Sequence, residues 1–476
     1  MGRESLCCSV EPVILTSSDK QPSPQINAEK DHPGMRIVHL AAGAGEMYCG
    51  TCLYANTLAS ALAATGHDVV LVPAYTPLRA ETASISRQRV VFGGINVYLQ
   101  QASALFRRTP WGLDRLLDHP WLLRWAGHMA SATDPRRLGP MTVSMLQGHD
   151  GRQRKELDKL VDWLSRELKP DIVHMSTGLL VGMARQIAED LRIPVIATLT
   201  GEDSFVEHLP EPYYRRTRDL LAERCSELAA LLTMNHYFAD YMSEYLGIAR
   251  RRFDVIPPGL DLGGYGPRLG ESDAEEFTIG FLARICPDKG LHILADAFSL
   301  LSRDATVRPA RLRVAGYLSK NDRDYLAGIR TKLAQRGLEA RFEYLGELDR
   351  ARKITFFQSL DAMSLPTVYR ECKGLPVLEA WACGVPAVLP DHGAFPEMIR
   401  DSGGGLLCRA NDPESLADCL KELIRNRTRA AELGRCGYEA AHGRYHAGLM
   451  AERTDAVYQR VARNHARGFG PADVEG

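Results

Sequence analysis

The chain has 476 residues, more than one hydrophobic core usually accommodates, so its length predicts two domains. A formal net charge of −1, with 25% charged and 45% hydrophobic residues, is typical of a globular protein. This balance gives no reason to expect nucleic acid or an anionic membrane as a partner. Eleven cysteines, an odd number scattered through apolar segments, argue against a disulfide framework.

Residues 1–34 are rich in serine, proline and polar residues and show no sustained hydrophobic period. We expect a disordered extension there, or an upstream start, because Met35 immediately precedes the first strong strand pattern. The N-terminus lacks the apolar core of a signal peptide, and no stretch reaches the roughly 18 apolar residues of a spanning helix. The sequence therefore predicts a cytoplasmic protein.

Short β-branched runs alternate with helix-like segments from Met35 onwards. Predicted strands lie at 35–45, 68–75, 170–176, 194–200, 227–235 and 254–259, with helices at 52–66 and 178–193. Residues 257–276, rich in Gly, Pro and acids, predict a linker. The alternation then restarts, with strands at 277–285, 311–317, 341–346, 361–367, 386–390 and 404–408 and helices at 290–303 and 323–337.

This alternation predicts an α/β protein with two doubly wound, Rossmann-like domains in tandem, each a parallel sheet covered on both faces. In such sheets ligands bind beyond the carboxyl ends of the strands. Two facing sheets would therefore place one binding cleft between them.

The segment 101–165 differs from its surroundings, because Trp111, Trp121 and Trp125 stand among arginines. One interpretation is an inserted helical cap whose tryptophans belong to the core. The alternative is an amphipathic surface, centred on 101–130, that contacts an acceptor lipid or a membrane. The arginines are too few to decide between the two.

Two cations follow the strand predicted at 277–285. Arg284 ends the run "GFLAR", and Lys289 follows five residues later, where the chain passes into a helix. Unpaired backbone N–H groups and the helix dipole add to these charges, so the pair predicts a site for a diphosphate. Taken alone, the two residues are better explained as solvated surface charges.

The stretch "YRECKGLPVLEA" strengthens the diphosphate interpretation. Gly374 and Leu375 begin a helix with Pro376 in its first turn, where the missing N–H costs nothing. The amides near Gly374 and Leu375 can point at a phosphate. Glu379, on the same helix, can accept both hydroxyls of a ribose. Glu371, before the turn, can accept hydroxyls of the group beyond the phosphates, so the pattern predicts a nucleotide diphosphate sugar as ligand.

The motifs together resemble the retaining glycosyltransferases of family 4, which have the GT-B fold with two Rossmann-like domains facing across a cleft. The resemblance extends from about Met35 to the C-terminal helix. It rests on "GAGEMYCGTC" at 43–52, "GFLARICPDKGLHILADAF" at 280–298, the Glu-x7-Glu motif within 365–388 and "HGAFPEMI" at 392–399. Any one motif is moderately specific, and their order and separation make the set strong.

The resemblance implies an N-terminal acceptor domain at 35–258, a C-terminal donor domain at 259–446 and a helix at 447–466 that crosses back to the first domain. It implies transfer of a hexosyl group from a nucleotide diphosphate sugar to an unidentified glycan, lipid or small-molecule acceptor. Arg284 and Lys289 then bind the donor diphosphate, Glu371 contacts the donor sugar and Glu379 binds the ribose. Gly45 and Gly50 belong to the glycine-rich loop that approaches the donor.

No cofactor and no metal are expected beyond the donor substrate. The family uses no essential metal, and nothing in the sequence argues for one. Asp322 and Asp324 form the only obvious Asp-x-Asp, but they lie in a polar, helix-like run.

The sequence departs from the family pattern at two places. The family often has Gly-Phe where this chain has Cys372 and Lys373. Lys373 either adds a third cation near the phosphates or only covers the turn. Many members carry a histidine where this chain has Thr200, so we expect a neighbour to replace it. The nearest replacements are Glu202, Asp203 and His174, and both strand ends are expected to face the cleft.

Two other classes of enzyme remain as alternatives. A nucleotide-sugar epimerase shares the architecture, but it needs an acid and a base flanking the sugar, and the sequence offers no firm pair. A dinucleotide oxidoreductase is favoured only by a lone glycine loop, which is unspecific. Cys49 and Cys52 have the spacing of a thiol redox motif, and the simpler explanation is that they are small residues that fit a loop near the donor.

Overall fold

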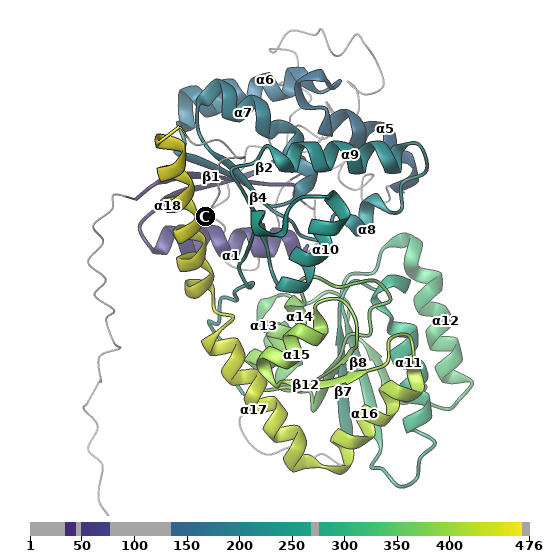
Figure 1. The fold of residues 1–476 in the computed structure, drawn as a ribbon. Coiled ribbons are helices and arrows are strands. Elements are labelled where there is room, and N and C mark those ends of the chain that lie inside the picture. Colours follow the sequence, from purple (N-terminus) through teal and green to yellow (C-terminus); the bar gives the residue numbers. More distant parts are fainter. Residues whose placement is uncertain (1–33, 44–48, 77–134, 268–275, 469–476) are drawn as a thin grey trace, which may run out of the picture. The chain divides into compact units, whose positions relative to one another are not determined.

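The computed structural model describes residues 34–43, 49–76, 135–267 and 276–468 (Figure 1). From Met35 onwards they form one compact unit. The expectations for 1–34, for the surface at 101–130 and for Gly45 fall outside the described part of the chain, apart from Gly34. None of the described helices is both long and apolar enough to span a membrane.

The N-terminal sheet has six described strands, all parallel, in the order β2-β1-β3-β4-β5-β6. These strands are β1 (Arg36–Ala41), β2 (Asp68–Pro73), β3 (Ile172–Met175), β4 (Val195–Thr198), β5 (Ala230–Thr233) and β6 (Phe253–Val255). The accompanying helices are α1 (Gly50–Ala64), α5 (Pro135–Leu146), α6 (Arg154–Trp163), α7 (Ala184–Leu191), α8 (Asp203–Val206), α9 (Tyr213–Ser226) and α10 (His236–Leu246).

The C-terminal sheet repeats this design in the order β12-β11-β10-β7-β8-β9, again with parallel pairing throughout its described strands. They are β7 (Phe277–Leu282), β8 (Ala310–Ala315), β9 (Phe342–Tyr344), β10 (Ala362–Ser364), β11 (Ala387–Pro390) and β12 (Gly405–Cys408). Its helices are α11 (Leu291–Leu301), α12 (Arg323–Ala334), α13 (Arg350–Gln358), α14 (Leu375–Ala382), α15 (Phe395–Ser402), α16 (Pro413–Arg425) and α17 (Arg427–Gly443). The two predicted parallel α/β sheets are therefore confirmed.

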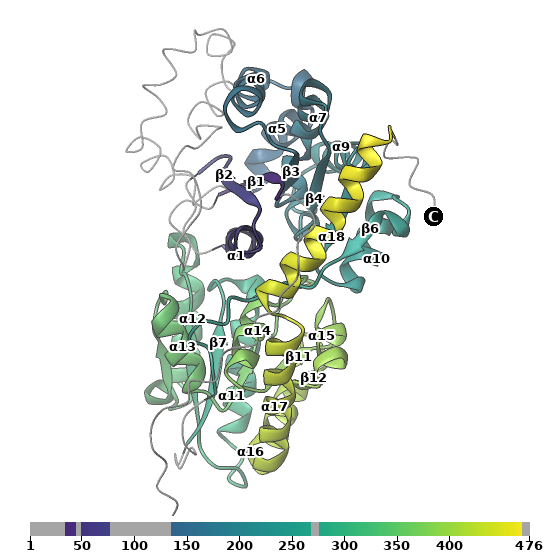
Figure 2. The same cartoon turned by 90° about the vertical axis from the view of Figure 1, so that its left-hand side faces the viewer.

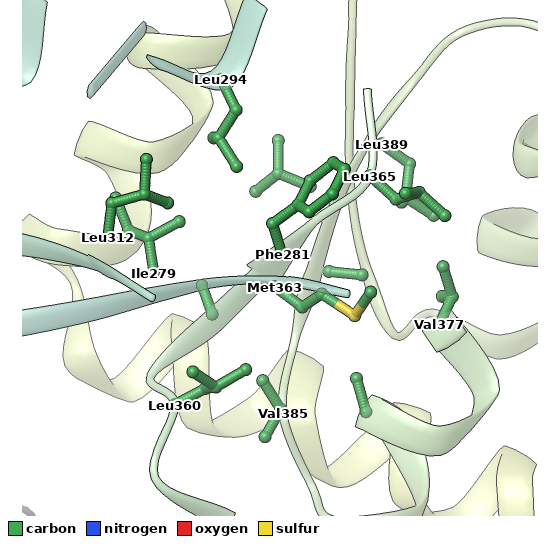
Figure 3. Packing of buried hydrophobic residues seen from close by; sticks show 14 of the residues in the cluster. Ile279, Phe281, Leu294, Leu312, Leu360, Met363, Leu365, Val377, Val385 and Leu389 are labelled. Carbon is green, nitrogen blue, oxygen red and sulfur yellow. The ribbon is translucent and has the colours of Figure 1, made fainter. Parts of the chain in front are cut away.

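Each sheet buries apolar side chains on both faces, as continuous hydrophobic strands require. In the C-terminal sheet, Phe281 of β7 lies among Leu294 of α11, Leu365 beyond β10 and Leu389 of β11 (Figure 3). In the N-terminal sheet, alternate residues of one strand join different clusters. Val38 and its neighbours pack with α6, α7, α9 and α10, whereas Ile37 packs with α1 and the last helix.

The last helix, α18 (Ala447–Ala466), returns to the N-terminal sheet (Figures 1 and 2). Tyr458 and Val461 of α18 join Tyr54 and Leu58 of α1 in one buried cluster. The chain thus passes between the sheets twice, after β6 and again between α17 and α18. The division into domains at 35–258 and 259–446 stays a prediction, since the described residues beyond Met35 cluster as one unit.

The two crossing segments are hydrogen-bonded to each other. The Leu260 amide donates to the Tyr445 carbonyl at 2.7 Å, and the Ala447 amide donates to the Leu260 carbonyl at 2.8 Å. An isolated parallel bridge pairs Leu260 with His446. This pairing fixes the place at which the chain enters and leaves the C-terminal sheet.

One predicted helix is built differently from the expectation. The segment 178–193 begins as a 3₁₀-helix, Gly178–Met183, and only then continues as α7. Gly182 lies so close to α5 that an added Cβ would meet the Met145 carbonyl oxygen at 2.1 Å. The hydrophobic period of segment 178–193 could not predict this close contact, because α5 is distant in the sequence.

Candidate active site

A cavity of about 790 Å³ is lined by residues from both halves of the unit. Its lining includes most of the residues that the sequence singles out, namely Cys49, Gly50, Thr200, Arg284, Lys289, Glu371, Cys372, Lys373, Leu375, Pro376 and Glu379. The wall therefore combines the start of α1, the loop after β4, the loop after β7 and the start of α14. Gly374 does not line the cavity, and Gly45 lies outside the described residues.

The loop that carries Arg284 and Lys289 is clamped against the loop after β10. Gly290 has a left-handed backbone (φ 76°), and an added Cβ would lie 1.7 Å from the Pro366 carbonyl oxygen. The Val368 amide donates to the Asp288 carbonyl at 2.8 Å. Only glycine permits this approach, which brings Lys289 next to the segment that contains Glu371.

Lys289, Tyr369 and Glu371 form a hydrogen-bonded cluster. The Lys289 ammonium donates to Glu371 Oε2 at 2.8 Å and to the Tyr369 hydroxyl, which itself donates to Oε2 at 2.5 Å. Glu371 Oε1 accepts the backbone amides of Cys372 and Lys373 at 3.1 and 3.0 Å. The charge of Lys289 is thus largely offset by Glu371, whereas Arg284 is exposed and forms no ion pair with a described residue.

Glu371 keeps its charge although it is buried. Burial alone would raise the pKa of its carboxyl group. The charges of Lys289 and Lys373 and the hydrogen bonds to the carboxylate outweigh burial and hold the pKa well below its usual range. Glu371 is therefore an ionised acceptor of hydrogen bonds throughout the neutral pH range.

The start of α14 follows the predicted pattern. Gly374 is the N-cap residue, with a left-handed backbone (φ 62°), and Pro376 lies in the first turn. A Cβ on Gly374 would lie 2.6 Å from Met398 Sδ, so Gly374 is packed against Met398 and does not line the cavity. Its role is to form the turn before α14. Leu375 and Pro376 of the first turn line the cavity. Pro376 has no N–H, and the Val377 and Leu378 amides donate to the Gly374 carbonyl, so Leu375 supplies the first-turn amide at the wall.

Glu379 is also buried in the wall, where it is 7% exposed. Its Oε1 accepts hydrogen bonds from the Tyr265 hydroxyl at 2.9 Å and from the Lys353 ammonium. The sequence did not identify Tyr265 or Lys353, because neither belongs to a motif around Glu379. Both also line the cavity.

The three expected replacements for the missing histidine are all buried, and none of them lines the cavity. His174 was expected to face the cleft, and this is wrong: its ring hydrogen-bonds Tyr458 and Thr198, each at 2.7 Å. Glu202 accepts hydrogen bonds from Thr177 Oγ1 and the Gly178, Thr200 and Gly201 amides, so it shapes the loop after β4. Burial, with Glu202 and Glu207 nearby, raises the pKa of Asp203 to about 6.

A side chain from the C-terminal half of the unit contacts the backbone of Thr200. Lys373 extends from the start of α14 and donates from its ammonium group to the Thr200 carbonyl. Burial alone would lower the pKa of Lys373, but nearby thiol and carboxylate groups raise it above its usual range. The two departures from the family pattern, 173 residues apart, therefore meet in one hydrogen bond.

A histidine that the sequence did not single out lies on the N-terminal side of the cavity. His208 is exposed and lines the wall, and its Nδ1 lies 2.6 Å from the Ser204 carbonyl oxygen. Because a carbonyl only accepts, Nδ1 carries the proton and Nε2 of the neutral ring remains an acceptor. No motif in the surrounding sequence marked His208.

Cys49 and Cys52 are both free thiols in the structure. Cys49 is the N-cap residue of α1 and lines the cavity, whereas Cys52 is buried behind it. A hydrogen bond from Cys52 lowers the pKa of the Cys49 thiol below its usual range, and Lys373 adds to this effect. Cys49 is therefore the more reactive thiol of the pair.

Two family models match the chain. "Glycosyl transferase 4-like domain" matches residues 50–259, and "Glycosyl transferases group 1" matches residues 269–440. Among curated relatives, D-inositol 3-phosphate glycosyltransferase of Nocardia farcinica is 30% identical over 204 residues, 41% of this chain and 45% of the relative. Phosphatidyl-myo-inositol mannosyltransferase of Mycobacterium leprae is 31% identical over 215 residues, 45% of this chain and 53% of the relative. The matches thus span about half the length of these relatives.

Solved structures with the same fold cover almost the whole chain. HepE of Anabaena, in complex with UDP, has a TM-score of 0.62 at 16% identity, covering 90% of this chain and all of its own. Sucrose-phosphate synthase of Thermosynechococcus elongatus has a TM-score of 0.64 at 15% identity, covering 90% of this chain and 99% of its own. At such identities the likeness establishes the fold alone. With both family models matching in order and two parallel sheets beside one cavity, the chain belongs to the GT-B glycosyltransferases of the family 4 type.

Proposed function

We propose that this protein transfers a hexosyl group from a nucleotide diphosphate sugar to an acceptor hydroxyl, with retention of the anomeric configuration. The observation that carries the proposal is the meeting of Arg284, Lys289, Glu371 and Glu379 in one cavity with the starts of α1 and α14. These groups suit three parts of one donor molecule, in which the diphosphate joins the ribose to the sugar.

In this proposal, cleavage of the anomeric bond develops negative charge on the departing diphosphate. Arg284, Lys289 and the Leu375 amide at the start of α14 stabilise that charge from fixed positions, which lowers the barrier. No resident metal or cofactor takes part. We therefore expect full turnover in the presence of EDTA, and a loss that added magnesium restores would contradict this part.

Glu371 is proposed to accept hydroxyl hydrogens of the transferred sugar at Oε2 in place of Lys289 or Tyr369, because both oxygens of the carboxylate already accept two hydrogen bonds each. Glu379 is proposed to do the same for the ribose, with Tyr265 and Lys353 fixing its orientation. Retention then follows from displacement on the face that the diphosphate leaves, where the diphosphate itself takes the acceptor proton. No carboxylate nucleophile of the kind used by retaining hydrolases is required.

The relatives suggest which substrates to test first. HepE was crystallised with UDP and with UDP-glucose, and curated relatives are named for inositol phosphate acceptors. We propose UDP-sugars as the first donors and a phosphorylated polyol as the first acceptor. A lipid acceptor that uses the surface at 101–130 stays a prediction outside the described residues.

The test incubates the full chain with UDP-, GDP- and ADP-hexoses, with and without acceptor, and measures release of free nucleoside diphosphate. We expect release only when an acceptor is present, and NMR of the product should show the anomeric configuration of the donor. An epimerase would change the donor sugar without any acceptor. Conversion of that kind, or no release with any donor and acceptor, would contradict the proposal.

A further inference from the structure

Lys373 differs from the other lysines of the cavity in its partner. Lys289 is paired with Glu371 and Lys353 with Glu379. The Lys373 ammonium instead rests on the Thr200 carbonyl and lies 3.9 Å from Cys372 Sγ. Among the described residues, no carboxylate forms an ion pair with it. A carbonyl offers only a partial charge, so Lys373 has no ion-paired carboxylate of its own at the wall, although Glu371 and Glu202 act on it at longer range.

The Lys373 ammonium lies near the point where the start of α1 approaches the start of α14. A Cβ on Gly50, the first residue of α1, would lie 3.6 Å from Leu375 Cδ1 and 3.7 Å from Lys373 Cε. Cys49, the N-cap residue of α1, lines the cavity beside this point. Lys373 therefore lies between the amino ends of α1 and α14, which both favour an anion.

Two of the cations at the cavity wall are not paired with a carboxylate and can bind an anionic ligand. Glu371 offsets Lys289, and Glu379 offsets Lys353, whereas Arg284 and Lys373 have no carboxylate partner among the described residues. A diphosphate needs more than one such cation in a water-poor site, because each unpaired charge is costly there.

We propose that Lys373 is a third phosphate-binding cation that takes an oxygen of the donor diphosphate, acting together with Arg284 and the two helix starts. This rests on the proposed function and deepens it. The Thr200 carbonyl orients the ammonium from the opposite sheet, so one side chain both binds the anion and links the two walls of the cavity. The rival explanation is a purely structural link between Lys373 and Thr200.

The experiment uses inorganic pyrophosphate and UDP as probes and measures their dissociation constants by calorimetry on the full chain. Lys373→Met keeps the length of the side chain and removes its charge, and Lys373→Arg keeps the charge. Lys320→Met removes an exposed lysine outside the cavity and is the matched control. We expect Lys373→Met to weaken pyrophosphate binding about tenfold or more, Lys373→Arg to retain most of the affinity and Lys320→Met to change nothing.

A wild-type measurement guards against misfolding of the variant. Acetylation of lysines by a soluble active ester, read by mass spectrometry, should be suppressed at Lys373 and unchanged at Lys320 when pyrophosphate is added. The proposal is overturned if Lys373→Met binds pyrophosphate like the wild type while Arg284→Met does not, or if pyrophosphate leaves Lys373 unprotected. These outcomes need no sugar transfer, so a chain that binds pyrophosphate through Lys373 but transfers no sugar contradicts the proposed function alone.

Discussion

At the scale of single residues, the two glutamates of the Glu-x7-Glu motif differ in what surrounds them. Glu371 is held by Lys289, Tyr369 and two backbone amides, whereas Glu379 is held by Tyr265 and Lys353. The spacing of the motif separates the two because α14 begins between them, with one glutamate before the helix and the other inside it. Different partners predict different effects of mutation.

Glu371→Gln should lower turnover about ten- to a hundredfold, because a charge-assisted contact of about 1.5–3 kcal/mol to the transferred sugar is lost. Binding of UDP should persist or tighten, since Lys289 is released toward the phosphates. Glu379→Gln should instead weaken UDP binding. Calorimetry with UDP and initial rates on both variants check this, and equal losses of UDP affinity would show that the roles are assigned wrongly.

Cys49 should react with iodoacetamide faster than an ordinary thiol at pH 7, because its lowered pKa leaves more of it as thiolate. Buried Cys52 should remain unmodified, and UDP should slow the reaction at Cys49. Peptide mass spectrometry after timed alkylation measures both rates, with half-buried Cys436 as the reference thiol. Modification of Cys52 before Cys49 would contradict the assigned reactivity.

Cys49 and Cys52 could also act as a redox switch, and this can be tested. We expect Cys49→Ser to keep most of the transferase activity, as for a small residue that only fits the loop. If mild oxidation abolished activity, dithiothreitol restored it and Cys49→Ser resisted the oxidant, the pair would be a switch.

At the scale of secondary-structure elements, two neighbouring interior strands of the N-terminal sheet carry a buried histidine pair. His39 of β1 and His174 of β3 are in register, and their rings stack at 4.4 Å. Neither ring nitrogen of His39 has a hydrogen-bond partner in the described part of the chain, and burial lowers its pKa to about 3. His174 is joined through Tyr458 to α18. Both rings are therefore neutral in the folded protein.

This pair makes stability depend on pH in a defined direction. The unfolded chain protonates His39 near pH 6.5, but the folded chain does so only near pH 3, so stability is lost as pH falls below about 6.5. The loss from His39 alone is about 1.4 kcal/mol per pH unit, or about 2 kcal/mol at pH 5. Urea unfolding of wild type and His39→Leu at several pH values tests this.

In His39→Leu, the free energy of unfolding should change less with pH than in the wild type, by the amount that one titrating group contributes. His149→Leu removes an exposed histidine and should leave the slope unchanged. An identical slope in His39→Leu and wild type would contradict the role of His39.

Most elements of the fold were predictable from the sequence because parallel strands are buried on both faces and read as continuous apolar runs. The spacing of Arg284, Lys289, Glu371 and Glu379 relative to those strands was enough to expect them near one cavity. What the sequence could not supply were contacts between distant segments. Lys373 reaches Thr200 across 173 positions, and Lys353 and Tyr265 reach Glu379 from separate loops.

The orientation of His174 was missed for a similar reason. A strand end predicts where a residue lies but not which face its side chain takes. In β3 the alternation places His174 against Tyr458 of α18. Helix α18 packs on the N-terminal sheet but follows all strands of the C-terminal sheet in the sequence.

At the scale of the whole unit, contacts join the two sheets beside the cavity. Glu397 of α15 accepts the His236 and Tyr237 amides at the start of α10, at 2.9 and 2.7 Å. The Asn235 side chain donates to the Cys372 carbonyl at 2.7 Å, and Cys372 packs into the hydrophobic cluster of the N-terminal sheet. These contacts couple the folding of the two sheets.

Glu397→Ala should weaken this coupling. A carboxylate at a helix start contributes about 0.3–1 kcal/mol through the helix dipole, with the hydrogen bonds in addition. We expect scanning calorimetry to show a broader transition or two resolved transitions in place of one. Glu414→Ala, an exposed acid in the first turn of α16, is the control and should keep the wild-type transition shape. A single sharp transition in Glu397→Ala would contradict the coupling.

The paired crossing segments have a mechanical consequence. Two tethers that lie side by side and bond to each other at Leu260, Tyr445 and Ala447 resist torsion and sliding, because either movement breaks their hydrogen bonds. Bending about the line through both tethers keeps those bonds intact. The hydrogen bonds therefore favour one movement between the two sheets, a bend about the line through both crossing segments.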